Sequence, residues 1–322
     1  MIELHKFVPG VGDSTMDVPF KPPQLAPRIS LALSLAILAC AARPAGAQQN
    51  QGFCNESLLA QIPARTAAAP SGSAFAQSVR TLSGTTRDQL TTSELMAGDV
   101  PEFLRHLVPV TVQRASGGRT ASVTVCVLPD YLAVGSNTDF LFVPMGLRAA
   151  LQVATRFGFV LPTPRLVDAI YAASSVKLDP QPLTPGAQMR STPYVLYHTQ
   201  LIKLQRQAWP APLGALTSGD KKDLVLTERL WQFPGRVAIY GWHRAQGRPI
   251  QPLSTVHGAR YADYSHGVRL VSRTAYVNGS ARRIEDVLAD PTLGPFLSGE
   301  GAMPHLAERL SKLIAELRAQ NP

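Results

Sequence analysis

Two alternating apolar runs separated by a pair of glycines constrain the fold of this chain more than any other feature. The runs cover residues 108–112 and 121–128, and Gly117 and Gly118 lie between them. In the second run valine alternates with serine, threonine and cysteine, which is the period-2 pattern of a strand with one buried face. Two such runs joined by a glycine-bearing turn predict a β-hairpin, so part of the core should rest on an antiparallel sheet.

Helical patterns precede and follow this hairpin. The pattern of residues 73–106 predicts short helices. In residues 146–157 the apolar side chains recur at helical spacing, which predicts another helix. Thr163 and Thr192 each precede a proline, and this pair marks a helix start because threonine caps the first amides while proline is tolerated in the first turn. The helix expected after Thr192 would turn Val195, Leu196, His198, Ile202 and Leu204 toward the core.

From residue 224 onward the pattern returns to strands and then closes with helices. Strands are expected at residues 224–227, 236–242, 250–256 and 268–271, and helices at residues 282–289 and 304–317. Helices and strands come in runs instead of alternating strictly, which is typical of the α+β class. The sequence therefore predicts a single α+β domain at residues 76–322, with a largely antiparallel sheet flanked by helices.

The N-terminal region predicts export. Residues 29–42 form an apolar run that is too short to span a bilayer comfortably, with Arg28 before it and the sequence Ala-Gly-Ala at residues 45–47 after it. A basic flank, a short apolar core and an Ala-x-Ala end make a secretory signal peptide. We therefore expect residues 1–47 to be a signal peptide with an extended leader.

The start and the attachment of the exported form have alternatives. Met16 is an alternative start to Met1, because the polar leader before the apolar run is longer than usual. Cys40 would anchor a lipoprotein, although Leu38 stands where a smaller residue is usual, and retention of the uncleaved segment is a further alternative. After cleavage we expect a mobile lead-in at residues 48–75, no transmembrane span, and a location in the periplasm or outside the cell.

The charge pattern and the missing motifs exclude several functions. The chain has a net charge of +9, but its charges are scattered and no usual nucleic-acid-binding motif occurs, so we expect no nucleic-acid partner. The sequence has no Gly-x-Ser-x-Gly elbow, no His-Glu-x-x-His pair and no Gly-x-Gly-x-x-Gly loop. Residues 214–221 approach a phosphate loop, but Asp220 precedes the lysine and the segment leads into a strand, which argues against nucleotide binding.

Two cysteines, Cys54 and Cys126, remain once the leader is removed. In an oxidising compartment such a pair predicts one disulfide. The alternatives are two inert thiols or a nucleophilic Cys126. The nucleophile is disfavoured because Cys126 lies in the middle of a predicted strand, away from the helix N-terminus that lowers the pKa of a thiol.

The densest group of chemically active side chains lies between residues 240 and 266. It contains three of the seven histidines, and His257, Tyr261 and Asp263 fall on the same side of an extended chain. Imidazole and carboxylate together suit either a metal site or an oriented general base. We therefore predict a catalytic centre formed by His243, His257, Asp263 and His266.

Two mechanisms are open for this centre. In the first, the four residues bind zinc or another divalent ion, which lowers the pKa of a bound water. In the second, a histidine and an aspartate act as an oriented base without metal, with Tyr261 or Tyr264 as the acid. A structural interpretation, with the histidines bonding turns and backbone groups, is the third. His198 has apolar neighbours on its predicted helix and is expected to be a core histidine.

Side chains around this centre suggest a polymeric substrate. Trp242, Tyr261 and Tyr264 would supply aromatic surface for sugar rings or peptide planes. Asp220 and Lys221 lie in a charged turn and would add to substrate binding if that turn reaches the same end of the sheet.

We expect an exported hydrolase that acts on an envelope or extracellular polymer, either a peptidoglycan peptide or a glycan. The alternative is a non-catalytic secreted or periplasmic envelope protein that binds glycan or peptide. A separation of the four predicted catalytic residues by more than about 8 Å would favour the alternative, because catalytic groups must share the reach of one substrate. The sequence does not indicate an oligomeric state or assign a family.

Overall fold

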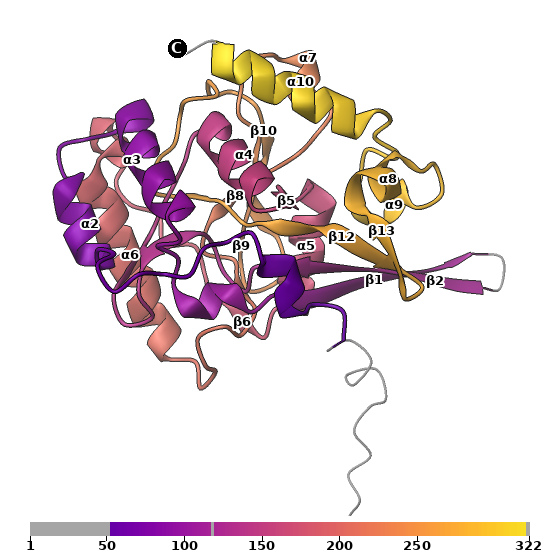
Figure 1. Cartoon of the computed structure of the whole chain (residues 1–322), viewed down its shortest axis with the longest axis horizontal. Coiled ribbons are helices and arrows are strands. Elements are labelled where there is room, and N and C mark those ends of the chain that lie inside the picture. Colours follow the sequence, from indigo (N-terminus) through magenta and orange to yellow (C-terminus); the bar gives the residue numbers. More distant parts are fainter. Residues whose placement is uncertain (1–51, 117–118, 320–322) are drawn as a thin grey trace, which may run out of the picture. The chain divides into compact units, whose positions relative to one another are not determined.

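The hairpin predicted from the alternating runs forms the longest strand pair among the described residues (Figure 1). Strands β1 (Val108–Ser116) and β2 (Arg119–Val127) pair antiparallel, with Val108 opposite Val127. The computed structural model describes residues 52–116 and 119–319. The expected signal peptide, the two alternative start residues and Cys40 therefore lie outside the described residues.

Strand β2 extends into a five-stranded sheet through β12 (Val271–Val277), which pairs with it antiparallel. The other edge of β12 pairs antiparallel with β13 (Ser280–Arg283) and with the short β5 (Phe159–Val160). The sequence predicted a strand that ends at residue 271 and a helix from residue 282, so it missed most of β12 and all of β13. The pairing of β12 with β2 shifts its register after Val271, and this irregularity interrupts the period-2 pattern.

A second sheet carries Trp242, His243 and His266 of the predicted site. Its strands run in the order β10 (Pro249–Ser254), β9 (Ile239–His243), β8 (Lys222–Leu224) and β11 (His266–Gly267). Neighbours are antiparallel except that β11 pairs parallel with β8. Four further strands form two small pairs, which are β3 (Ala133–Gly135) with β4 (Phe140–Phe142), antiparallel, and β6 (Val176–Lys177) with β7 (Thr217–Ser218), parallel.

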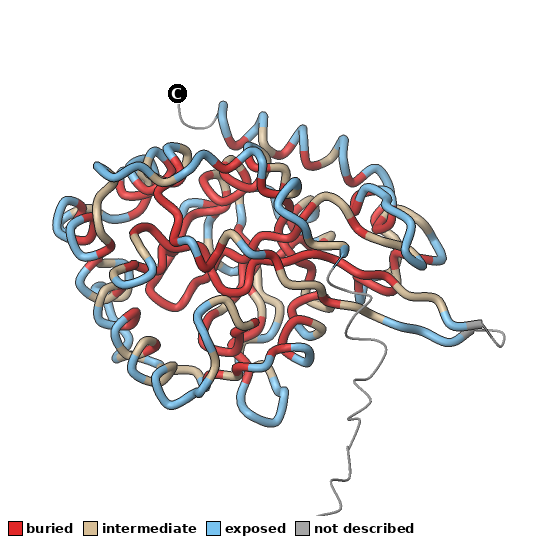
Figure 2. The backbone as a smooth tube through the Cα atoms, turned by 60° about the horizontal axis from the view of Figure 1, so that its bottom comes forward, coloured by how far each residue is buried: buried red, intermediate tan, exposed pale blue. Residues whose placement is uncertain are grey.

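Helices surround these sheets, and buried residues form the continuous middle of the described chain (Figure 2). The longer helices are α2 (Gly72–Ser78), α3 (Gly84–Met96), α4 (Leu147–Arg156), α5 (Pro164–Ala173), α6 (Thr192–Gln207) and α10 (Leu306–Ala319). Short helical segments are η1 (Glu56–Leu59), η2 (Glu102–Arg105), η3 (Ala187–Arg190), α7 (Arg229–Gln232), α8 (Ile284–Ala289) and α9 (Gly294–Leu297). Antiparallel pairing prevails, so the predicted α+β class is confirmed.

The two threonine–proline pairs behave differently. Thr163 caps α5 as predicted, because its hydroxyl accepts a hydrogen bond from a backbone N–H of the first turn at 3.2 Å. Helix α6 is capped instead by Ser191, whose hydroxyl accepts the corresponding bond. The hydroxyl of Thr192 lies 2.9 Å and 3.1 Å from the carbonyl oxygens of Val79 and Leu82, so it ties α6 to the end of α2. The prediction of Thr192 as the cap was therefore wrong.

Helix α6 buries a narrower stripe than the sequence predicted. Val195, His198 and Ile202 are buried, Leu196 is half-buried and Leu204 is 61% exposed. Spacings of three and four residues keep the first three on one face, whereas Leu204 follows Ile202 by only two positions and turns away from the core.

Residues 52–75, which belong to the lead-in predicted at residues 48–75, pack against the rest of the domain. Leu59 and Ile62 are buried, and the ring of Phe53 lies 4.5 Å from that of Tyr276. All described residues belong to one compact unit. The small and polar residues of this segment suggested mobility, but a few buried apolar side chains are enough to fix it.

Cys54 and Cys126 form the predicted disulfide, with their Cα atoms 5.5 Å apart. Cys126 lies in β2 and is fully buried, so the bond joins the first described residues to the centre of the main sheet. In this bonded form neither the inert-thiol nor the nucleophile alternative applies to Cys126.

We expect the Cys54→Ala/Cys126→Ala variant to have a free energy of unfolding lower by about 2–4 kcal/mol, because the bond restricts the unfolded chain over a separation of 72 residues. Urea unfolding followed by circular dichroism measures this difference. The wild type with reductant should shift by a similar amount, and equal midpoints for oxidised wild type and variant would contradict the prediction.

Candidate functional site

The loop that joins β10 to β11 carries His257 and Asp263, two of the four predicted catalytic residues, and His266 follows as the first residue of β11. Backbone hydrogen bonds hold the loop near both of its ends. The carbonyl of His257 accepts a bond from the segment that leads into β9 at 3.1 Å, and the carbonyl of Ser265 accepts one from the N–H of Lys222 at 2.8 Å. Between them, the carbonyl of Ala259 accepts from the N–H of Leu147, the first residue of α4, at 2.8 Å. The loop is thus held between the second sheet and the start of α4.

His257, Tyr261 and Asp263 of this loop lie together with His266 of β11, and we call these four residues the loop cluster. The ring of His257 stacks on that of Tyr261 with centroids 3.9 Å apart, and the Tyr261 hydroxyl donates to Oδ2 of Asp263 at 3.0 Å. Nε2 of His266 lies 4.0 Å from the same oxygen. The rings of His257 and His266 are 6.4 Å apart.

Asp263 is buried and well supplied with hydrogen-bond donors. Its Oδ1 accepts from the backbone N–H of Ser265 at 2.8 Å and from the hydroxyl of Ser265 at 2.6 Å. Burial alone would raise the pKa of Asp263, but His266, the bonds from Ser265 and the nearby charge of Lys222 outweigh burial and lower that pKa. Asp263 is therefore a carboxylate that holds the Tyr261 hydroxyl in place.

The two histidines of the cluster are neutral near pH 7. Burial lowers the pKa of His266 to about 4, with Asp263 acting against the shift and Lys222 adding to it. Neither ring nitrogen of His266 has a hydrogen-bond partner among the described residues. Burial also lowers the pKa of His257, helped by the charges of Lys222 and Arg236. A neutral imidazole can accept a proton, which is what a base requires.

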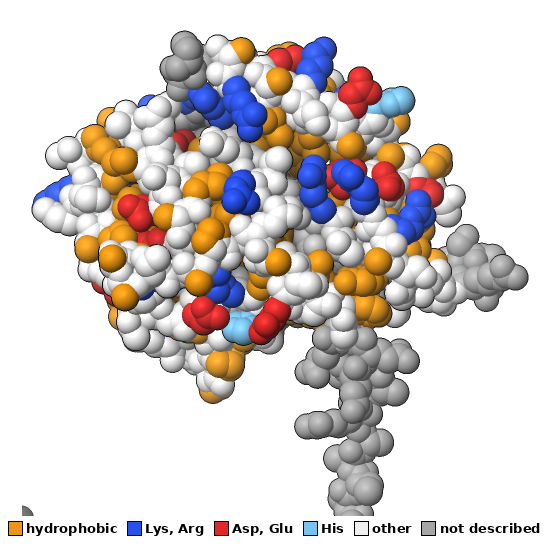
Figure 3. Space-filling model, in the orientation of Figure 1, with side chains coloured by type: hydrophobic (Ala, Val, Ile, Leu, Met, Phe, Trp, Pro, Cys, Tyr) orange, Lys and Arg blue, Asp and Glu red, His pale blue; other side chains and the backbone are white. Residues whose placement is uncertain are grey.

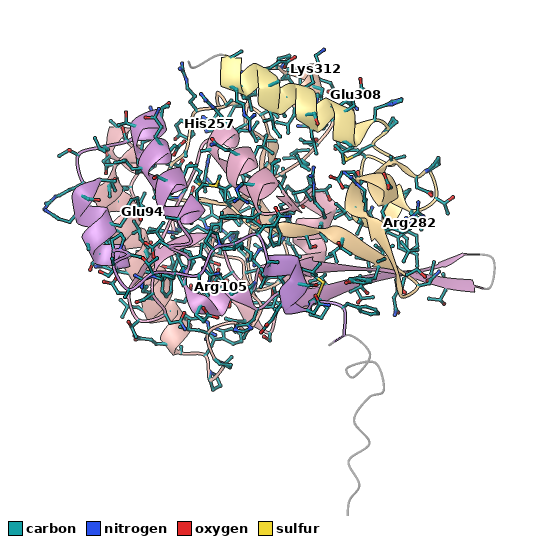
Figure 4. All side chains as sticks on the ribbon, in the orientation of Figure 1. Glu94, Arg105, His257, Arg282, Glu308 and Lys312 are labelled. Atoms are coloured by element: carbon teal, nitrogen blue, oxygen red, sulfur yellow. A yellow bond between two sulfur atoms is a disulfide. The ribbon has the colours of Figure 1, made fainter. Side chains whose placement is uncertain are left out.

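The loop cluster borders a cleft of about 660 Å³. The cleft is lined by residues of α3, by the first two turns of α4, by residues 258–261, by Arg190 and by Leu317 of α10. Tyr261 is the member of the cluster that lines it. Figure 4 labels His257, which precedes this lining segment and appears between α3 and α10 in that view.

A second carboxyl group, Asp88 of α3, lines the same cleft. Its Oδ2 accepts from the N–H of Gly146 at 2.8 Å, while its Oδ1 is buried without a partner among the described residues. Burial raises the pKa of Asp88 to about 6, against the Gly146 bond and the charges of Arg87 and Arg190. No local pattern marks Asp88 as a site residue, because an aspartate beside an arginine on a helix is also what a solvated face contains.

Gly146 permits this arrangement by its small size. A Cβ at that position would lie 2.9 Å from Oδ2 of Asp88 and 3.0 Å from the carbonyl oxygen of Ala259. Three segments that are distant in the sequence therefore meet at one residue without a side chain. This close approach sets Asp88 of α3 against the loop that carries Tyr261.

His243 contacts a different set of residues. Its Nε2 lies 2.9 Å from Oδ1 of Asp168, and its ring stacks on that of Tyr171 at 4.6 Å. None of the hydrogen bonds or ring contacts found among residues 52–116 and 119–319 joins His243 to the loop cluster. We therefore leave His243 out of the catalytic centre.

The rings of Trp242 and Tyr264 are buried and do not form an exposed aromatic surface. Trp242 is buried, has a φ of 57°, and donates from Nε1 to the carbonyl of Asp220 at 3.0 Å. Tyr264 is buried, and its hydroxyl accepts from the N–H of Leu183 at 2.7 Å. Both predictions of substrate contact were wrong, because the strand and loop turn these rings inward.

Asp220 and Lys221 are also fully buried, so the charged turn is not the solvated, substrate-facing turn that the sequence suggested. The ammonium of Lys221 lies 3.0 Å from Nδ1 of His198 and donates to the carbonyl of Tyr264 at 2.7 Å. Burial lowers the pKa of Lys221 to about 8, and burial followed by Lys221 lowers that of His198 to about 2. His198 is buried in α6, as expected of a core histidine.

A buried network next to Lys221 joins the two sheets. Arg269 donates to the carbonyls of Leu128 at 2.8 Å and Thr217 at 2.6 Å, and its guanidinium lies 4.3 Å from the ring centroid of Tyr131. The Tyr131 hydroxyl donates to Oδ2 of Asp223 at 2.9 Å. The sequence analysis did not predict this network, because each of its residues is an isolated polar position in an apolar strand or loop.

The metal interpretation has no ligand set in the part of the chain that the structure describes. No group of three or more histidine, cysteine, aspartate or glutamate side chains is placed there to hold one ion. We therefore develop the metal-free mechanism for the loop cluster.

A membrane-spanning helix must be both long and apolar. None of the described helices within residues 52–319 is both long and apolar enough to cross a bilayer.

Comparison of the chain with protein-family models, with curated proteins and with solved structures finds no match. The site must therefore be interpreted from its own geometry.

Proposed function

We propose that the chain is an exported hydrolase of an envelope or extracellular polymer and that it cleaves glycosidic bonds in the cleft beside the loop cluster. The observation that carries the proposal is the hydrogen bond from the Tyr261 hydroxyl to Asp263, at a position where Tyr261 lines the same cleft as Asp88. The disulfide and the signal-like N-terminal pattern support export, because both suit an oxidising compartment.

The two carboxyl groups have opposite environments, which suits a division into acid and base. Asp88, with its raised pKa, is the proton donor to the leaving oxygen. Asp263 is the carboxylate that accepts the hydrogen bond of the Tyr261 hydroxyl. Burial and the charge of Asp263 raise the pKa of that phenol to about 12, so its proton passes to Asp263 only as the tyrosine oxygen bonds to the anomeric carbon. A carboxyl pair of this kind is the usual machinery of glycosidic cleavage, and tyrosine replaces the second carboxylate as nucleophile in some enzymes.

The proposed reaction has two steps that balance. In the first, the Tyr261 oxygen bonds to the anomeric carbon, its proton passes to Asp263, the glycosidic C–O bond breaks, and Asp88 protonates the departing oxygen. In the second, water attacks the same carbon and gives a proton to Asp88, while the tyrosine oxygen leaves and recovers its proton from Asp263. The sum is the addition of one water across one glycosidic bond.

The second candidate is the non-catalytic glycan- or peptide-binding protein. It is favoured by the burial of Asp263 and His266, because buried side chains do not contact a substrate directly. Asp263 is only 2% exposed, and its contact with a residue of the cleft is the hydrogen bond from Tyr261. A binding protein would need the ring of Tyr261 but not its hydroxyl.

The proposal is tested by incubating purified residues 48–322 with peptidoglycan and with a panel of extracellular polysaccharides, and by measuring new reducing ends. We expect release by the wild type and a loss of about 10²–10⁴-fold in Asp88→Asn. Asp168→Asn, which alters a carboxylate bonded to Tyr240 and His243 outside the loop cluster, should keep its activity. Absence of release from every polymer would favour the binding protein.

The pH dependence of kcat/KM follows from Asp88. The proton donor must be protonated in the free enzyme, so we expect kcat/KM to fall about tenfold per pH unit above about pH 6. Asp263 stays ionised below pH 6 because its pKa is lowered, so it adds no fall between pH 5 and 6. Initial rates from pH 4 to 9 measure the profile, and a plateau that continues to pH 8 would contradict the role of Asp88.

A further inference from the structure

We propose that the polymer is a glycan that carries carboxylate groups, and that Arg190 and Arg260 bind these carboxylates at the cleft. This inference rests on the proposed function, because it names the substrate class of the same site. Binding of carboxylates would make the site specific for acidic glycans, which the proposed roles of Asp88 and Tyr261 do not require.

The charges that line the cleft are strongly unequal. The exposed residues Arg190 and Arg260 bring two guanidinium groups against the single carboxyl of Asp88, and the lining residues other than these three and Arg148 carry no charge. Figure 3 shows lysine and arginine side chains gathered between α3 and α10, in the region where Figure 4 labels His257. A cleft with this excess of positive charge concentrates anionic ligands.

Arg190 is placed to bind a substrate that sits on Tyr261. It is the last residue of η3, its side chain is exposed, and its guanidinium carbon lies 5.5 Å from the ring centroid of Tyr261. Its carbonyl accepts from the buried guanidinium of Arg87 at 2.9 Å, so the backbone at this position is held from inside. The Arg190 guanidinium therefore presents a planar set of donors beside the proposed nucleophile.

Arg260 lies on the other side of the proposed nucleophile in the sequence, directly before Tyr261. Its side chain is exposed, and the neighbouring backbone is fixed because the carbonyl of Ala259 bonds to the first turn of α4. Two exposed guanidiniums on anchored backbone flank one phenol. This arrangement fits a carboxylated sugar, because arginine binds carboxylates through two parallel hydrogen bonds.

The positive charge continues past the cleft at His257. Arg236 forms a β-bridge with Gly258, the residue after His257, and Lys222 lies opposite His266 in the pairing of β8 with β11. Polar uncharged residues of the lining, Gln89 and Gln152, offer partners for hydroxyl groups. A repeating chain of hydroxyls and carboxylates matches both features, whereas a neutral glycan would bring no anionic group to Arg190 and Arg260.

The test measures binding in the Tyr261→Phe background, which keeps the ring beside Arg190 but lacks the proposed nucleophile. Isothermal titration with oligomers of polygalacturonate, alginate and hyaluronate is compared with titration of their methyl esters, which keep the sugar chain and lose the charge. We expect at least one acid form to bind about tenfold or more tightly than its ester, with an affinity that falls as salt rises.

Arginine variants then assign the contacts. Arg190→Gln and Arg260→Gln should each weaken binding of the acid form about tenfold, and the ester should bind as before. The control is Arg282→Gln on β13, an exposed arginine that Figure 4 labels away from His257 and that should not change the affinity. Equal binding of acid and ester, no binding of any of the three acids, or an equal effect of the control would overturn the inference.

The outcome is separable from that of the proposed function. Cleavage of a neutral glycan by the wild type, with no preference for acids, would overturn the carboxylate inference and leave the hydrolase intact. Acid-specific binding without cleavage of any bound polymer by the wild type would retain the arginine contacts and overturn the hydrolase.

Discussion

The Arg269→Met variant is expected to unfold with a free energy about 3–5 kcal/mol below that of the wild type at pH 8. Arg269 is fully buried, and its Nε lies 3.9 Å from Oδ1 of Asp223. Its removal leaves two carbonyl groups without their donors and a buried carboxylate without its nearest cation. Methionine fills a similar volume, so the loss reports charge and hydrogen bonding more than a cavity.

The sign of the pH dependence provides an internal check on this prediction. Burial raises the pKa of Asp223 to about 7, and Arg269 opposes that rise. A carboxyl with a raised pKa in the folded state loses stability as pH increases from its unfolded value toward the folded one. Without Arg269 the folded pKa rises further, so the loss extends to higher pH and the variant should be hurt more at pH 8 than at pH 6.

Urea unfolding at pH 6 and pH 8 measures both quantities. The control Arg282→Met, at an exposed arginine 3.8 Å from Asp290, should change the free energy of unfolding by less than about 1 kcal/mol. A difference below about 1 kcal/mol for Arg269→Met at pH 8 would show that the buried network does not support the fold.

Tyr261→Phe is expected to lower kcat by about 10²–10⁴-fold on any polymer that the wild type cleaves. The phenol is the proposed nucleophile, and phenylalanine keeps the ring that stacks on His257 at 3.9 Å. The hydroxyl contributes little to ground-state binding in this mechanism, so KM should change less than threefold. A loss confined to kcat distinguishes a chemical role from a binding role.

Tyr240→Phe is the matched control. Its hydroxyl also donates to a carboxylate, Oδ1 of Asp168 at 2.9 Å, but Tyr240 lies on β9 and does not line the cleft. The substitution therefore removes the same kind of hydrogen bond elsewhere, and kcat should stay within twofold of wild type. Similar losses in both variants would mean that the Tyr261 effect is structural.

Local patterns predicted the parts of the fold that depend on neighbouring residues. The hairpin of β1 and β2 follows from alternation around Gly117 and Gly118, and the start of α5 follows from the cap at Thr163. Pairing of the two remaining cysteines followed from their number. The hairpin and the helix cap depend on a few neighbouring residues. The disulfide could be predicted because each of the two cysteines has only one possible partner.

The candidate site could be predicted only in part. The sequence spacing predicted that His257, Tyr261 and Asp263 lie on the same side of the chain. In the structure Tyr261 contacts both of the other two residues. Asp88 and Arg190 escaped, because they reach the cleft by the packing of α3 and η3 against that loop. No local pattern separates a cleft residue from a solvated one on a polar helix.

The opposite error affected the residues around β8 and β9. Asp220 and Lys221 looked like a solvated turn because charges usually avoid burial. They are buried because Lys221 finds His198 and a backbone carbonyl as partners, which are contributions of distant segments. His243 likewise finds Asp168 on α5 instead of the other histidines.

The most direct test of the proposed hydrolase is digestion in H₂¹⁸O, with mass spectrometry of the released fragments. The mechanism predicts one ¹⁸O atom at the new reducing end of each fragment released by residues 48–322, and release that is slower by about 10²–10⁴-fold from Tyr261→Phe. Unlabelled fragments, or labelled fragments released equally by Tyr261→Phe, would contradict hydrolysis through Tyr261.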